Sequence, residues 1–179
     1  MTYSLELDHV TKTFGAQLAV NDISARIPEG SIYGFLGPNG AGKTTTIRMI
    51  MNILYPDSGT ISVLGGSPGA MKDRLGYLPE EKGLYKKMKT AELVTYFGRL
   101  KGMQLGEARS QAHTLLERFG LGHCIDSRCD ALSKGMGQKV QIISTLMHDP
   151  ELVSTSSMPL SGLRPQIRCR NGAISDSQN

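Results

Sequence analysis

Alternation of apolar and polar side chains predicts several short strands in the first half of the chain. Residues 5–8 and 23–27 show a period of two, which is typical of half-buried strands. Residues 31–36 (SIYGFL) form a nearly continuous apolar run that leads into a glycine-rich loop, so we expect a buried strand there. Residues 60–64 and 75–79 are predicted to be two further short strands that run into turns or loops.

A period near 3.6 residues predicts the helices. Residues 43–55 carry apolar side chains at i, i+3, i+4 and i+7. Further helices are expected at residues 91–103, 106–119 and 135–148. The first of these three should bury one apolar face, made of Leu93, Tyr96, Phe97 and Leu100. Strands followed by helices favour an α/β nucleotide-binding core with an inserted helical subdomain at about residues 85–148.

The composition is that of an ordinary globular chain. Its 179 residues suit one domain or most of one. The net charge of +4 permits an anionic partner, although a solvated basic surface is the simpler explanation. The three cysteines lack the spacing of a zinc site, so we expect reduced thiols. Glu6 and Asp8 interrupt the N-terminus and no apolar stretch approaches about 18 residues, so neither a signal peptide nor a membrane span is expected.

Residues 37–44 (GPNGAGKT) match the phosphate-binding pattern G-x-x-x-x-G-K-[ST] between a predicted strand and a predicted helix. The glycines let the backbone N–H groups of residues 40–45 turn toward a β-phosphate, and the helix N-terminus adds partial positive charge. We expect Lys43 to reach the β and γ oxygens of ATP and the Thr44 hydroxyl to bind Mg²⁺. The alternative is a glycine-rich turn with an incidental lysine. The expected nucleotide-binding residues of this loop are Gly37, Asn39, Gly40, Ala41, Gly42, Lys43, Thr44 and Thr45.

Three stretches together resemble one protein family. Residues 9–50, residues 76–88 (GYLPEEKGLYKKM) and residues 132–141 (LSKGMGQKVQ) are similar to the ATP-binding subunits of ATP-binding-cassette (ABC) transporters. The likeness is greatest to bacterial export-type cassettes of the multidrug or sodium-extrusion kind. It implies a P-loop NTPase core with an N-terminal antiparallel β subdomain and an inserted α-helical subdomain. Residues 1–153 then form a partial nucleotide-binding domain that lacks the C-terminal part of the core.

The pentapeptide LSKGM at residues 132–136 resembles the LSGGQ signature of this family. Ser133 and Gly135 open a predicted helix, where a hydroxyl and free amides can bind an anion. The resemblance implies that this anion is the γ-phosphate of an ATP held by a second cassette, so that two cassettes pack head to tail. An ordinary helix N-cap is the alternative reading.

Two further positions are assigned by the resemblance alone. Phe14 occupies the place where the family stacks an aromatic ring on adenine, and a core phenylalanine beside Gly15 is the alternative. Glu80 stands where most cassettes have the Q-loop glutamine, so it is the candidate catalytic residue and a candidate Mg²⁺ ligand. A solvated surface glutamate is the alternative for Glu80.

The family pattern breaks after residue 153. Asp149 to Val153 begin the expected approach to an apolar strand, but Ser154 to Met158 (STSSM) follow where the family has an aspartate and a glutamate. Neither serine nor methionine accepts a proton from water near neutral pH. We therefore expect hydrolysis near background, and a reading-frame change or truncation is our hypothesis for the break. Residues 154–179 are serine- and arginine-rich without a sustained period, so a disordered or misfitting tail is expected.

The resemblance implies an ATP-binding transporter subunit that binds Mg²⁺ and ATP. Its implied partners are a transmembrane permease at the cytoplasmic face of the cell membrane and a second cassette, with no nucleic acid. The rival interpretation is a truncated nucleotide-binding interaction protein without ATPase activity. Soluble cassettes of DNA repair or translation are a third class, although the sequence shows no long coiled-coil insertion and no tandem cassette.

Overall fold

The computed structural model describes residues 2–79 and 85–155. These residues form two compact units, one built from residues 2–75 together with Ser154 and Thr155, and the other from Gly76–Val153. Each unit has its own secondary structure and its own buried side chains, and each is described separately below.

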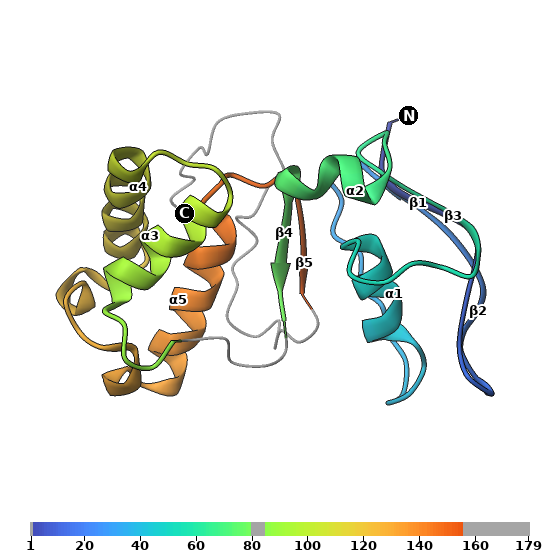
Figure 1. Ribbon diagram of the computed structural model, residues 1–179, viewed down its shortest axis with the longest axis horizontal. Coiled ribbons are helices and arrows are strands. Elements are labelled where there is room, and N and C mark those ends of the chain that lie inside the picture. The colour runs from blue at the N-terminus through green and yellow to red at the C-terminus, as the bar shows by residue number, and fades with distance from the viewer. Residues whose placement is uncertain (1, 80–84, 156–179) are drawn as a thin grey trace, which may run out of the picture. The chain divides into compact units, whose positions relative to one another are not determined.

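The first unit is built on a three-stranded antiparallel sheet. Its order is β2–β1–β3, so that β1 (Tyr3–Phe14) lies between β2 (Gln17–Pro28) and β3 (Ser58–Val63). Figure 1 labels these three strands and the helices of both units. The helix α1 (Lys43–Ile50) contacts the sheet strands β2 and β3. After β3 come the short helix α2 (Pro68–Met71) and the 3₁₀ turn η1 (Lys72–Arg74), and the first of these begins at a Ser67 cap. Apolar residues buried in this unit include Leu5, Leu7, Val10, Val20, Ile47, Met49, Ile50 and Val63.

The strands predicted at residues 5–8, 23–27 and 60–64 are confirmed as parts of β1, β2 and β3. The buried strand predicted at residues 31–36 is wrong. This segment forms no strand in the described part of the chain, and Ile32 and Leu36 are 80% and 95% exposed. An apolar run becomes a sheet strand only when neighbouring strands take up its backbone hydrogen bonds. No strand among residues 2–79 and 85–155 pairs with it.

Three helices form the core of the second unit. They are α3 (Thr90–Leu100), α4 (Leu105–Arg118) and α5 (Lys134–Leu146), which confirms the three helices predicted in this half of the chain within a few residues. The 3₁₀ turns η2 (Gly122–Cys124) and η3 (Cys129–Ala131) connect α4 to α5. Leu93, Val94, Ala108, Ala112, Leu116, Val140 and Ile143 are central members of the apolar cluster.

Two further short strands, β4 (Leu75–Leu78) and β5 (Leu152–Thr155), pair with each other. The strand β4 matches the one predicted at residues 75–79. Because β5 includes Ser154 and Thr155, regular structure continues two residues beyond the point where the family pattern breaks. The rest of the expected tail, from Ser156 onward, lies outside the described residues.

The buried face of α3 differs from the prediction. Leu93 is buried and Phe97 packs against the core, but Tyr96 and Leu100 are exposed, and Val94 is buried in their place. The helix contacts both α4 and α5, so its buried stripe must serve two partners. Gly98 allows this packing, because a Cβ atom there would lie 2.8 Å from the Cε atom of Met147 and 3.4 Å from the Cβ atom of Ala108.

Both cysteines of the described residues, Cys124 and Cys129, are buried free thiols. Burial raises the pKa of the Cys129 thiol, which keeps it protonated near neutral pH. The third, Cys169, lies outside the described residues. Within the same ranges, none of the helices has the length and apolar character that crossing a bilayer requires.

Candidate functional site

The glycine-rich loop leads directly into α1. Gly42 caps the helix in the left-handed conformation, with φ +79°, and a Cβ atom there would overlap the backbone carbonyl of Ala19 on β2. Gly40 also has a positive φ, +84°. Such φ values are readily adopted only by glycine, so the loop can pass this close to β2 only with glycine at residue 42. The predicted helix after the loop is confirmed, although it ends at Ile50 rather than residue 55.

Lys43 is folded back over the loop that precedes it. Its Nζ atom donates hydrogen bonds to the carbonyl oxygens of Gly37 at 2.6 Å and Pro38 at 2.7 Å. The N–H of Thr46 donates to the Gly42 carbonyl at 2.8 Å, which is the first bond of the helical ladder. The preceding amides of residues 43–45 have no intrahelical acceptor. An ammonium group, glycine backbone and free helix amides therefore lie within one short stretch.

This arrangement fits the polyphosphate of a nucleotide. Free amides and the dipole at a helix N-terminus bind anions, and a lysine adds a mobile positive charge. Within residues 2–79 and 85–155, no group of three or more His, Cys, Asp or Glu side chains is placed to hold a metal ion. Mg²⁺ at this loop would therefore depend on phosphate oxygens together with the hydroxyl of Thr44, which is half-buried in the first turn of α1. Glu80, the other candidate ligand, lies outside the described residues.

Phe14 ends β1 at the tip of the β1–β2 hairpin. Its side chain is 46% exposed and does not belong to the apolar core, so the interpretation as a core phenylalanine is wrong. The Nζ atom of Lys12 lies 5.6 Å from the centroid of the Phe14 ring, within the range of a cation–π interaction. Lys12 thus contacts the ring, and nearly half of the Phe14 surface stays exposed, which leaves room for contact with a planar ligand.

Asp57, the residue directly before β3, is bound to this hairpin tip. One of its carboxylate oxygens accepts a hydrogen bond from Lys12 Nζ and the other from the backbone N–H of Thr13, each at 2.7 Å. Sequence reasoning missed Asp57, which lies in the stretch PDSG (residues 56–59) after the predicted helix. Its acidic side chain beside a turn was the available signal, but the partner residues are more than forty positions away.

The hydrogen bonds from Lys12 and Thr13 hold the pKa of Asp57 below its ordinary value of 3.8. A depressed pKa stabilises the folded state above pH 3.8, and this contribution is lost as the pH falls through the lower folded-state pKa. We therefore expect the difference in free energy of unfolding between the wild type and Asp57→Asn to be larger at about pH 6 than at about pH 2.5. Urea unfolding at both pH values measures this difference. The control is Asp73→Asn, which changes an exposed aspartate. A difference that does not change with pH would contradict the prediction.

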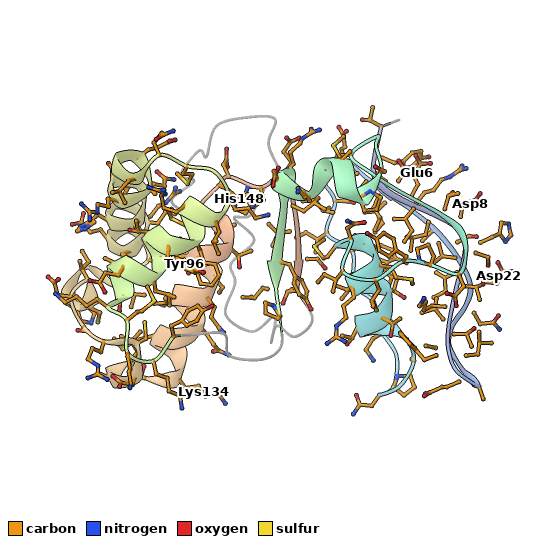
Figure 2. All side chains as sticks on the ribbon, viewed as in Figure 1. Glu6, Asp8, Asp22, Tyr96, Lys134 and His148 are labelled. Atoms are coloured by element: carbon orange, nitrogen blue, oxygen red, sulfur yellow. The ribbon has the colours of Figure 1, made fainter. Side chains whose placement is uncertain are left out.

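The predicted signature residues open α5 as expected. Ser133 caps the helix, and its Oγ atom accepts a hydrogen bond from the N–H of Met136 at 3.3 Å. Ser133, Lys134 and Gly135 are exposed, and Figure 2 shows Lys134 at the beginning of α5. The structure thus provides an accessible helix N-terminus in the second unit, while its role toward a phosphate stays a prediction.

A groove of about 700 Å³ lies on the second unit along α3 and α4. The residues that the α3 prediction wrongly buried, Tyr96 and Leu100, line this groove together with Leu105. The charged residues of the lining are Lys89, Arg99 and Arg109, together with the acids Glu92 and Asp126. An exposed apolar surface with a charged border is typical of a protein contact site.

Comparison with known proteins agrees with these features. The family model described as "ABC transporter" matches residues 20–154. The "Uncharacterized ABC transporter ATP-binding protein YhaQ" of Bacillus subtilis (strain 168) is 47% identical over 90% of this chain and 54% of its own. The "ABC transporter ATP-binding protein NatA" of the same organism is 42% identical over 81% of this chain and 61% of its own. The chain therefore spans about half the length of the curated relatives it matches.

A solved structure described as "Structure of ATP binding subunit of ABC transporter" superposes with a TM-score of 0.77 at 30% identity, over 92% of this chain and 69% of the other. A second, cbiO1 from Clostridium perfringens, has the same TM-score at 23% identity and supports the fold alone. The loop before α1, the capped start of α5, the family match and these likenesses agree. The chain belongs to the ATP-binding proteins of the ABC transporter family.

Proposed function

We propose that this chain binds Mg-ATP as the ATP-binding subunit of an ABC transporter. The observation that carries the proposal is the loop that ends in Gly42 and Lys43, where glycine backbone, an ammonium group and the free amides of α1 come together. Lys43 bonds two loop carbonyls here, and phosphate oxygens offer its ammonium a stronger, charged partner. Gly40, Gly42 and the first residues of α1 contribute backbone amides, and Thr44 contributes an oxygen for Mg²⁺. The N–H of Ala41 donates to the Pro38 carbonyl at 3.3 Å and would have to leave it to reach a phosphate.

The other ligand contacts are proposed on the basis of family membership. Phe14 stacks on adenine, and its exposure at the hairpin tip supports this role. Glu80 offers a carboxylate to Mg²⁺ or to water as the tentative catalytic residue. Ser133 and Gly135 bind the γ-phosphate of an ATP on a second cassette in a head-to-tail dimer, which the accessible start of α5 supports.

The proposed membrane partner is a transmembrane permease, which places the chain at the cytoplasmic face of the membrane. The groove along α3 and α4 is the contact surface that we assign to it. Lys89 pairs with Asp126 at 3.2 Å, whereas no ion pair is recorded among the described residues for Arg99 and Arg109. An amphipathic permease segment with acidic residues beside its apolar face complements this lining.

We expect Leu100→Ser to reduce the fraction of the chain that sediments with membranes, because it removes apolar contact area from the groove. The membranes are taken from the cells that produce the chain. The matched control is Leu18→Ser, which changes an exposed leucine of β2 on the first unit. Equal sedimentation of both variants and the wild type would remove the groove from the proposal.

A second candidate is a nucleotide-binding interaction protein without ATPase activity. The stretch Ser154–Met158, which lacks any acid, is the observation that favours it. Calorimetry with Mg-ATP, run beside a phosphate-release assay, tests both candidates. Binding with turnover supports the transporter subunit, binding without turnover favours the second candidate, and absence of binding excludes both.

A further inference from the structure

We propose that Asp57 is a positioning residue of the adenine subsite, which holds Lys12 and Phe14 in place at the tip of the β1–β2 hairpin. The inference rests on the proposed function, since it takes Phe14 to be the ring that receives the base. The inference adds Asp57 and Lys12 to the proposed nucleotide site. Neither residue belongs to the phosphate-binding loop or to the signature motif.

Asp57 binds three successive residues at the end of β1. Its backbone N–H donates to the carbonyl of Thr11 at 2.9 Å, and its two carboxylate oxygens accept from Lys12 Nζ and from the N–H of Thr13. Both bonds to the carboxylate are short, and the one from Lys12 is also an ion pair. The strand is thereby fixed up to the residue that directly precedes Phe14.

Lys12 links Asp57 to the Phe14 ring, because it contacts both. Its side chain is only 16% exposed, which is unusual for lysine and shows that the stem is packed rather than free in solvent. With its Nζ atom bound to Asp57, the ammonium group lies 5.6 Å from the centroid of the Phe14 ring. The ring is therefore contacted by a cation whose own position is determined by a carboxylate.

Ordering an aromatic ring before the ligand arrives favours binding. A free side chain loses rotamer freedom when a base stacks on it, whereas a ring that is already fixed loses less. Removing the carboxylate should therefore weaken binding of a ligand that has a base. It should not affect a ligand that consists of phosphates alone, because the loop and Lys43 make no hydrogen bond to Asp57 among the bonds recorded for the described residues.

The first experiment measures the position of the ring without any nucleotide. The chain contains no tryptophan, so Phe14→Trp introduces a single fluorophore at the hairpin tip. We expect the fluorescence anisotropy of this indole to fall when Asp57→Ala or Lys12→Met is added, and to recover with Lys12→Arg in place of Lys12→Met. Unchanged anisotropy in the Asp57→Ala and Lys12→Met variants would overturn the inference.

The second experiment separates the base from the phosphates. Calorimetry is performed with Mg-ATP and with Mg-tripolyphosphate, which lacks a base. Asp57→Ala should weaken ATP binding about twofold to fivefold and leave tripolyphosphate binding unchanged. In a Phe14→Ala background, Asp57→Ala should have no further effect on ATP binding. Asp22→Ala, which breaks the ion pair with His9 in the same hairpin, is the control and should change neither affinity.

The outcomes distinguish the inference from the proposed function. An equal loss of affinity for both ligands would show that Asp57 merely supports the fold, and would overturn the inference. A wild-type chain that binds neither ligand would refute the proposed function. In that case the anisotropy of the indole still decides whether Asp57 positions the residue at the hairpin tip.

Discussion

Lys43→Ala is expected to reduce the affinity for Mg-ATP by about tenfold to a hundredfold, measured by calorimetry. A hydrogen bond to a charged partner contributes about 1.5–3 kcal/mol, and this lysine is the only residue of the loop 37–44 that carries a positive charge. In the structure its Nζ atom already lies over the loop, bound to the carbonyls of Gly37 and Pro38. The variant loses the ammonium group at the point where the phosphates are expected.

The control for this experiment is Arg48→Ala. Arg48 lies on the same helix, is exposed, and carries the same charge, so its removal changes the net charge of the chain equally. We expect ATP binding to be nearly unchanged in this variant. An unchanged affinity in Lys43→Ala, with the wild type binding normally, would exclude the loop as the nucleotide site.

Turnover of bound ATP is expected to lie about 10²–10⁴-fold below that of an ordinary enzyme, hence under about 1 s⁻¹. Loss of a general base typically costs this much, and Ser154 to Met158 contain no acid at the place where the family has an aspartate and a glutamate. Phosphate release by the purified chain at saturating Mg-ATP measures it.

Lys43→Ala, purified in the same way, supplies the background from contaminating ATPases. Wild-type release at the level of this variant agrees with the prediction. Release at about 1 s⁻¹ or faster would show that another residue replaces the missing acids, and Glu80 would then be the first candidate to test by Glu80→Gln.

Sequence patterns predicted those features whose structure is determined by contacts within a few residues along the chain. The glycines at residues 40 and 42 and the helix that begins at Lys43 follow from backbone geometry and spacing within a few residues. The Ser133 cap of α5 is a contact across three residues. These features, together with the start of each long helix within a few residues, could be predicted from the sequence.

Features that depend on distant partners could not be predicted in this way. The buried stripe of α3 is set by α4 and α5, so Val94 is buried and Leu100 is exposed although both are apolar. Asp57 acquires its role only when the fold brings it to Lys12 and Thr13. Apolar character shows that a side chain can be buried. Which apolar side chains are buried depends on the elements that pack against them.

The exposed apolar segment at residues 31–36 has a consequence for how the chain behaves at high concentration. Its six residues are uncharged, and Ile32 and Leu36 are 80% and 95% exposed, so the segment offers apolar surface to other molecules. We therefore expect the hexapeptide that introduces the nucleotide loop to favour association between copies of the chain as the concentration rises.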